Sequence, residues 1–186
     1  MTKTVILDGA RTAFGKMGGS LASLTASDLG GVAIKEALNR AGVAPESVDE
    51  VIMGTVLQAG QGQIPSRQAA TKAGIPWGVK TETINKVCAS GMRAVTLADQ
   101  LIRLGEEETI VAGGMESMSN APYYLPKGRF GLRMGDAQMI DGMIYDGLSC
   151  SFDPKRVHMG TYGNATAEKF DLCREKQDEW SFRSLD

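Results

Sequence analysis

The first 115 residues alternate between short apolar runs and stretches in which apolar residues recur every three or four positions. Short runs rich in β-branched residues are typical of buried strands, and the longer spacing is typical of helices with one apolar face. Strands are predicted at residues 4–7, 49–56, 81–84 and 109–112, and helices at 25–41, 65–73 and 89–104. This β-α-β-α-β-α-β order predicts an α/β layered domain whose sheet is at least partly parallel. Active sites in such sheets lie at the carboxyl ends of the strands.

Two of the predicted helices carry further signals. Thr25 and Asp28 form a capping-box pattern at the start of the first helix, and Gly42 ends that helix. The third helix has apolar residues on most of its sides, and a helix of that kind is usually buried. We therefore expect the helix at 89–104 to lie inside the layered domain.

The pattern changes after Gly114. Residues 115–137 show no clear period, and a structureless stretch of this length is usually functional or an oligomer contact. Three basic residues on it could meet phosphate or a partner subunit, although a solvated loop is the commoner role: Lys127, Arg129 and Arg133. Further helices are predicted near 139–148, at 161–170 and at 174–185, and the sequence is expected to stop inside a domain.

Composition narrows the classes of function. The chain has 186 residues, enough for one domain or one and a fraction, and 42% are hydrophobic, enough for a buried core. Lys and Arg total 20 against 22 Asp and Glu, so the net charge of −2 gives no general attraction to nucleic acid or anionic lipid. The sequence contains no apolar stretch of membrane-spanning length, and its N-terminal apolar run is too short for a signal peptide.

The three cysteines and one histidine predict neither a disulfide framework nor a metal site. Such usage favours a reducing compartment, and we expect the protein to be cytoplasmic. The predicted surroundings of Cys88 favour a reactive cysteine. The strand-to-helix junction places its sulfur at a helix N-terminus, where the helix dipole favours a thiolate. A buried structural cysteine is the alternative and commoner role. Cys150 and Cys173 lack this setting and are expected to be inert.

His158 lies in a predicted loop. It is the one histidine of the sequence, so any Cys–His pair within the chain must use it. A lone loop histidine more often makes structural hydrogen bonds than acts as a base.

The segment 85–92, which reads Asn-Lys-Val-Cys-Ala-Ser-Gly-Met, resembles the nucleophile motif of the thiolase family. Further segments spread along the chain resemble other motifs of that family: 11–16, 60–63 with 67–70, 113–119 and 158–160. Two positions depart from the family pattern. Ile64 stands where a polar residue is more usual, and Cys173 stands where a helix-capping Ser or Thr is usual.

The resemblance implies a thiolase-like αβα N-terminal half at residues 1–118 and the beginning of an inserted loop domain at 119–186. The loop domain would include the arm through which short-chain thiolases form tetramers, so a homo-oligomer is expected. The implied reaction belongs to fatty acid metabolism: two acetyl-CoA molecules condense to acetoacetyl-CoA, or the reverse thiolysis occurs. Coenzyme A thioesters would be substrates, and no cofactor is expected.

The resemblance also implies roles for individual residues. Cys88 would be the catalytic nucleophile that becomes acetylated, and its backbone N–H would contribute to an oxyanion hole. Leu148 and His158 would lie along the bound coenzyme A, and Met159 would lie near the acyl group.

A full thiolase is about twice as long as this chain, and its second half supplies the histidine that activates the nucleophile. We therefore expect the C-terminal thiolase domain to be absent from this sequence. Two hypotheses stay open: the N-terminal part of an acetyl-CoA acetyltransferase, or a catalytically inactive fragment that only binds coenzyme A or self-associates. A ketoacyl synthase is a weaker alternative, because those enzymes lack the His-Met-Gly pattern of residues 158–160.

Overall fold

The computed structural model describes residues 3–185. The chain divides into two compact units, Met1–Met143 and Ile144–Asp186. The predicted domain boundary after residue 118 falls inside the first unit, because Asn120 Nδ2 donates hydrogen bonds of 2.9 Å to the carbonyl oxygens of Ala22 and Leu24. These bonds tie the start of residues 119–143 to the first unit. The boundary between family domains stays a prediction.

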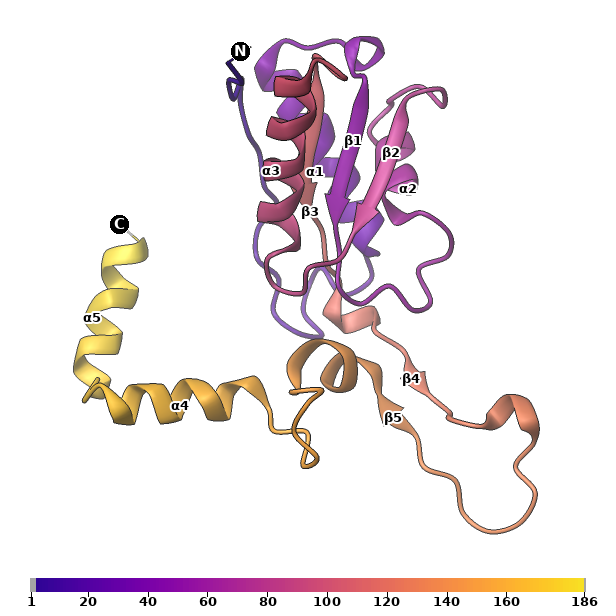
Figure 1. Cartoon of the computed structure of the whole chain (residues 1–186), viewed down its shortest axis with the longest axis vertical. Helices are drawn as coiled ribbons and strands as arrows, with labels where there is room; N and C mark the ends of the chain where they lie inside the picture. Colours follow the sequence, from indigo (N-terminus) through magenta and orange to yellow (C-terminus); the bar gives the residue numbers. More distant parts are fainter. Residues whose placement is uncertain (1–2, 186) are drawn as a thin grey trace. The chain divides into compact units, whose positions relative to one another are not determined.

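A three-stranded parallel sheet lies at the centre of the first unit (Figure 1). Its strands are β1 (Glu50–Gly54), β2 (Lys80–Ile84) and β3 (Ile110–Gly114), in the order β2-β1-β3. Both strand pairs are parallel, so the carboxyl ends of all three strands lie at one edge, the lower edge of the sheet in Figure 1. The predicted α/β class with a parallel sheet is confirmed.

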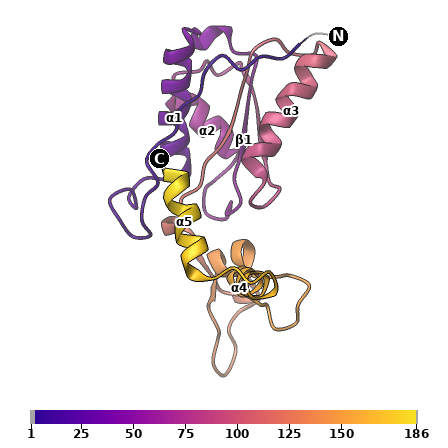
Figure 2. The ribbon, with the colours of Figure 1, turned by 90° about the vertical axis from the view of Figure 1, so that its left-hand side faces the viewer.

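Helices cover both faces of this sheet (Figure 2). Helices α1 (Ala26–Ala41) and α2 (Pro65–Lys72) lie on one side, and α3 (Ser90–Leu104) lies on the other. Successive side chains of a strand point to opposite faces. In β1, Val51 and Met53 join the core formed with α1 and α2, and the buried Ile52 between them therefore points toward the α3 side. The predicted αβα layering is confirmed.

Local signals set the ends of α1 as predicted. The Thr25 hydroxyl accepts a hydrogen bond from the backbone N–H of Asp28 at 3.2 Å, and the Asp28 carboxylate accepts one from the N–H of Thr25 at 2.8 Å. Gly42 follows the helix with φ 64°, a left-handed conformation that costs glycine little.

The predicted strand at residues 4–7 is wrong. Val5, Ile6 and Leu7 are between 63% and 83% exposed, and no strand is assigned to them. A β-strand needs a neighbour that satisfies its backbone groups, and no strand of the part of the chain between residues 3 and 185 pairs with this run. An apolar, β-branched sequence alone did not create the pairing.

The expected burial of the whole third helix is also wrong. Only Ser90, Ala94 and Ala98 of α3 are buried, whereas Met92 is 70% exposed and Leu104 is 72% exposed. One face of α3 packs on the sheet through small residues, and the residues of this chain that the structure describes leave the opposite apolar face open to solvent.

The first unit ends in an arm, which we define as residues 121–142. Its base is a short antiparallel ladder between β4 (Tyr123–Tyr124) and β5 (Ile140–Asp141). Three 3₁₀ turns also lie in the first unit: Pro45–Ser47, Met118–Asn120 and Gly128–Phe130. The helix predicted near 139–148 is partly wrong, because its first residues form β5 and only Met143–Leu148 is helical, as one π-helical turn.

The second unit contains α4 (Met159–Lys169) and α5 (Arg174–Leu185), which confirm the two helices predicted there. Residues 144–185, all of which the structure describes, include no buried residue. Among the helices within residues 3–185, none is long and apolar enough to cross a lipid bilayer.

Candidate active site

Cys88 lies on a tight turn at the carboxyl edge of the sheet, between the end of β2 at Ile84 and the start of α3 at Ser90. Its side chain is exposed. The alternative of a buried structural cysteine is therefore wrong, and the predicted position at a helix N-terminus is confirmed. The positive end of the α3 dipole and the accessible sulfur together suit attack on an electrophile.

Ser90 and Asn85 hold this turn from its two sides. The Ser90 hydroxyl accepts a hydrogen bond from the Lys86 N–H at 2.8 Å and donates one to the Val87 carbonyl at 2.6 Å. The Asn85 side-chain oxygen accepts a hydrogen bond from the Val87 N–H at 2.9 Å. Val87 has φ 50°, which is strained for a β-branched residue and persists only where its surroundings enforce it. The residue before Cys88 is thus fixed by bonds on both of its backbone polar groups.

Glycines allow the first turn of α3 to lie directly on the strand ends. A Cβ on Gly54, the last residue of β1, would lie 2.5 Å from the Ser90 carbonyl carbon. A Cβ on Gly114, the last residue of β3, would lie 3.2 Å from the Cα of Gly91. Close backbone contact therefore sets the height of the Cys88 turn above the sheet edge.

Leu148, His158 and Met159 all belong to the second unit, whereas Cys88 belongs to the first. Ser149 pairs with His158 in an antiparallel bridge, so Leu148 and Met159 flank a single paired position. His158 is the N-cap of α4 rather than a plain loop residue, and its Nδ1 accepts a hydrogen bond of 3.0 Å from the Gly160 N–H. An accepting Nδ1 leaves Nε2 to carry the proton of the neutral ring, so His158 presents a donor rather than a base. The structure thus brings the three predicted binding residues together, and their role stays a prediction.

Cys150 has a setting that the sequence analysis missed. The backbone N–H groups of Phe152 and Asp153 hydrogen-bond its sulfur and lower the pKa of the Cys150 thiol, and the Tyr162 hydroxyl adds to this effect. The reciprocal interaction with Cys150 raises the pKa of Tyr162. Cys150 does not lie at a helix N-terminus, as expected, but two backbone N–H groups of a loop act on its sulfur, and the sequence did not predict them. Cys173 is exposed and immediately precedes α5, where the sequence pattern placed it.

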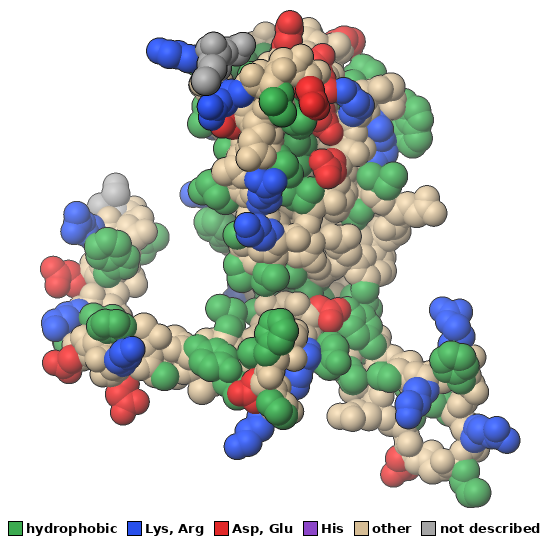
Figure 3. All heavy atoms as spheres, viewed as in Figure 1, with side chains coloured by type: hydrophobic (Ala, Val, Ile, Leu, Met, Phe, Trp, Pro, Cys, Tyr) green, Lys and Arg blue, Asp and Glu red, His purple; other side chains and the backbone are tan. Residues whose placement is uncertain are grey.

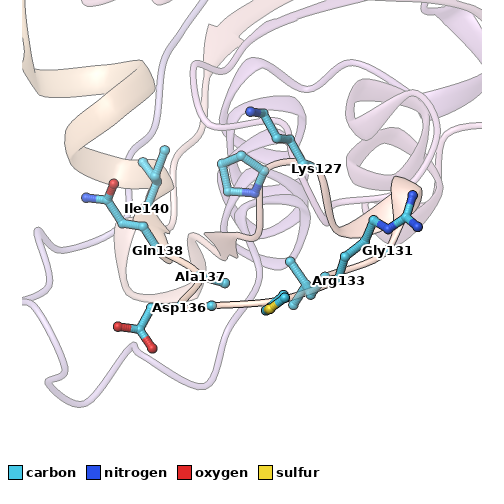
Figure 4. Close-up of a pocket in the computed structure, with 11 residues that line it drawn as sticks. Lys127, Gly131, Arg133, Asp136, Ala137, Gln138 and Ile140 are labelled. Carbon is cyan, nitrogen blue, oxygen red and sulfur yellow. The ribbon is translucent and has the colours of Figure 1, made fainter.

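The arm contains a hollow of about 410 Å³ whose lining residues all lie between Pro126 and Ile140 (Figure 4). Lys127 and Arg133 project from its rim, and Asp136 lies at the opposite side. In Figure 3, Lys and Arg side chains and hydrophobic side chains gather on this arm, at the lower right. Arg129 is likewise exposed, so the basic trio of the sequence analysis is solvated. Within residues 3–185, no group of three or more His, Cys, Asp or Glu side chains is placed to hold a metal ion.

These observations define a class of protein: an αβα layered domain with an exposed cysteine on a strained turn at the carboxyl edge of a parallel sheet. Residues 4–186 match the family model described as "Thiolase, N-terminal domain". The chain belongs to the thiolase family, which confirms the resemblance noted from its motifs.

Several relatives share the whole length of this chain. An acetyl-CoA acetyltransferase of Cupriavidus necator is 54% identical over 184 residues, covering 99% of this chain and 46% of that protein. An acetyl-CoA acetyltransferase of Schizosaccharomyces pombe is 48% identical over 183 residues, covering 98% and 46%. A cytosolic acetyl-CoA acetyltransferase of Gibberella zeae is 51% identical over 179 residues, covering 96% and 45%. The chain spans about half the length of the curated relatives it matches.

Proposed function

We propose that this chain supplies the nucleophile of an acetyl-CoA C-acetyltransferase. The Cys88 thiolate attacks the thioester carbonyl of acetyl-CoA, the carbon–sulfur bond to coenzyme A breaks, and coenzyme A leaves as a thiolate that takes up the proton lost when Cys88 ionised. The α-carbon of a second acetyl-CoA, after losing a proton, then attacks acetyl-Cys88, which releases acetoacetyl-CoA and the free cysteine. Thiolysis is the same sequence in reverse.

One observation carries this proposal: Cys88 is exposed on the turn that precedes α3, at the carboxyl edge of the sheet. Membership of the thiolase family supports it, as do relatives named acetyl-CoA acetyltransferase. Thioesters are already activated acyl donors, so coenzyme A thioesters serve as substrates in this proposal and no cofactor takes part. Fatty acid metabolism is the proposed setting.

Leu148, His158 and Met159 are proposed to contact the coenzyme A thioester. Their support is the Ser149–His158 bridge, which gathers them, and the exposure of His158 and Met159. The Nε2–H that His158 presents would donate to a carbonyl of the pantetheine chain. A cytoplasmic location is proposed on the three free cysteines and on the cytosolic relative.

The arm is proposed to mediate homo-oligomer formation. Its support is a group of large, solvent-exposed apolar side chains, which includes Phe130 at 84% exposure and Met134 at 94% exposure. Sedimentation of the chain tests this. The double variant Phe130→Asp and Met134→Asp is expected to shift the chain to monomer. Phe152→Asp, at a phenylalanine of the second unit that is 97% exposed, is expected not to.

Acetylation mapping tests the proposed reaction. The purified chain is incubated with acetyl-CoA, and adducts at Cys88, Cys150 and Cys173 are quantified by mass spectrometry. Selective acetylation of Cys88, by at least about tenfold, is expected. Turnover is measured in a chimera in which this chain replaces the matching segment of the Cupriavidus necator relative, and Cys88→Ser is expected to abolish it.

Two results would overturn the proposal: equal labelling of all three cysteines, or thiolysis by a Cys88→Ser chimera at the unsubstituted rate. Coenzyme A binding without any acetylation of Cys88, together with an inactive but folded chimera, would instead support a non-catalytic binding module.

A further inference from the structure

We propose that Glu116 is a positioning residue for the Cys88 turn, acting through the loop after β1 and through Asn85. This inference rests on the proposed acyl transfer at Cys88. The hydrogen bonds of Glu116 go to residues 55–57. Its side chain comes from the residues that follow β3, whereas Cys88 follows β2.

The Glu116 carboxylate holds three donors of the loop that follows β1. Its Oε1 accepts hydrogen bonds of 3.2 Å from the Thr55 hydroxyl and from the Leu57 N–H, and its Oε2 accepts one of 2.8 Å from the Val56 N–H. Thr55 and Leu57 are buried. Buried backbone N–H groups require an acceptor, and an ionised carboxylate is a strong one.

Asn85 connects this loop to the Cys88 turn. Its Nδ2 donates a hydrogen bond of 3.2 Å to the Val56 carbonyl oxygen, and its Oδ1 accepts the 2.9 Å hydrogen bond from the Val87 N–H. Val56 therefore bonds to Glu116 through its N–H and to Asn85 through its carbonyl. The chain of bonds runs from Glu116 through Val56 and Asn85 to the residue that precedes Cys88.

The turn needs this support because Val87 is strained. Its φ of 50° is unfavourable for a β-branched side chain, so the conformation relaxes when the surrounding bonds are removed. Ser90 restrains Val87 from the helix side, at the carbonyl, and Asn85 restrains it from the strand side, at the N–H. Attack on a thioester demands a placement of the sulfur to within about an ångström, since larger errors cost about a hundredfold in rate. Glu116 thus helps to position the Cys88 sulfur for the reaction.

Three variants of the chain test the inference. Glu116→Gln replaces one carboxylate oxygen by an amide NH₂, which cannot accept a hydrogen bond. Asn85→Ala keeps every bond of Glu116 and removes the two bonds of the Asn85 amide, the one donated to the Val56 carbonyl and the one accepted from the Val87 N–H. Glu46→Gln, at an exposed glutamate on the Pro45–Ser47 turn, is the matched control for the loss of one charge.

The first measurement is amide hydrogen exchange, which does not depend on acyl transfer. Glu116→Gln is expected to accelerate amide exchange about tenfold at Val56 and Leu57, and also at Val87, whose N–H bonds to Asn85 and not to Glu116. Asn85→Ala is expected to accelerate amide exchange at Val87 and to leave amide exchange at Leu57 unchanged. Unchanged exchange at Val87 in folded Glu116→Gln would overturn the proposal.

The second measurement compares two reactions of Cys88. Acetyl transfer from acetyl-CoA is expected to fall about tenfold in Glu116→Gln and in Asn85→Ala, and the double variant is expected to be no slower than Asn85→Ala. Alkylation by iodoacetamide, which makes no demand on orientation, is expected to stay within about twofold. A merely unfolded variant would change both reactions, and full acetyl transfer by Asn85→Ala would overturn the proposal even if Glu116→Gln does not fold.

The proposed function and this inference fail separately. An unsubstituted chain that never acetylates Cys88 would remove the proposed reaction, while the exchange of Val87 would still decide whether Glu116 holds the turn.

Discussion

Residues 26–115 and residues 144–185 of this chain both form helices, but different contacts support them. In the first region, α1 and α2 pack on β1 through a shared cluster that includes Ile34, Leu38 and Val51, each at most 6% exposed. In the second region, α4 and α5 contain no buried residue, and Trp180 and Phe182 are about 70% exposed. A helix in water gains most of its stability from packing. The comparison therefore predicts a cooperative first region and a second region whose helices open easily.

Amide hydrogen exchange would show the largest difference between the two regions. Amides in the middle of α4 and α5 are expected to exchange about a thousandfold faster than those around Ile34 in α1, because their opening exposes no apolar core. Mass spectrometry of the chain under native conditions measures both regions in one sample. Equal protection of α1 and α5 would break the comparison.

Removing matched leucines would give the next largest effect. Leu38→Ala, at a position 6% exposed in α1, is expected to lower the free energy of unfolding by about 2–5 kcal/mol through a cavity in the core. Leu185→Ala, at a position 84% exposed in α5, is expected to change it by less than about 0.5 kcal/mol. Urea denaturation followed by circular dichroism measures both, and similar losses would contradict the assignment of the core.

Ion pairs are expected to give a smaller difference in stability between the two regions. Lys72 Nζ lies 2.6 Å from Asp28 Oδ1. This ion pair, together with hydrogen bonds from the Thr25 hydroxyl and backbone N–H, lowers the pKa of Asp28 from 3.8 to about 2. This pair joins α1 to α2, whereas the Arg174–Asp178 pair lies within one helix. Since Asp28 is partly exposed, solvent screening reduces its contribution to about 1 kcal/mol.

Stability curves against pH test this pair. The folded-state pKa of Asp28 is depressed, so its stabilisation is present above about pH 4 and is lost as the pH falls toward about 2. Asp28→Asn is expected to be less stable than the unsubstituted chain at pH 7 and equally stable near pH 2. Asp178→Asn is the control and is expected to change stability by no more than about 0.5 kcal/mol at either pH.

A substitution at the start of α2 is expected to have the smallest effect on the free energy of unfolding, and to raise it rather than lower it. Ile64 precedes this helix with φ 44° and lacks a side-chain capping bond, whereas Thr25 caps α1. Ile64→Asn is expected to stabilise the chain by about 1 kcal/mol, because asparagine tolerates the left-handed region and isoleucine does not. Ile64→Val keeps the β-branch and is expected to give no gain. Thermal unfolding measures both, and a destabilising Asn would contradict the account.

The sequence predicted those features that local residues determine. Thr25, Asp28 and Gly42 mark the ends of α1 by themselves, and the junction at residues 84–90 placed Cys88 correctly at the start of α3. The thiolase motifs likewise identified the family. The failures involve distant partners. Residues 4–7 have the composition of a strand, but none of the strands within residues 3–185 pairs with them. Met92 has the character of a core residue but is 70% exposed.

The missed parts of the site have the same origin. Within residues 3–185, hydrogen bonds connect Glu116 and Asn85 through the Val56 backbone, which lies far from both in the sequence. The surroundings of Cys150 depend on two backbone N–H groups that converge on its sulfur, and residue types do not report that orientation. Ile64 alone gave a partial signal, because a polar residue usual at its position suits a positive φ.

The parallel sheet has a consequence for how the chain acquires its structure. Glu50 pairs with Lys80 on one side and with Ile110 on the other, so no strand of this sheet pairs with a neighbour joined by a short hairpin. Long loops must close before these ladders gain any energy, and folds dominated by such contacts form slowly. During synthesis on the ribosome, β1 can form its ladder with β3 only after β3 has emerged. The Cys88 turn rests on the ends of β1 and β3, and we therefore expect it to be among the last features of the first unit to reach its final shape.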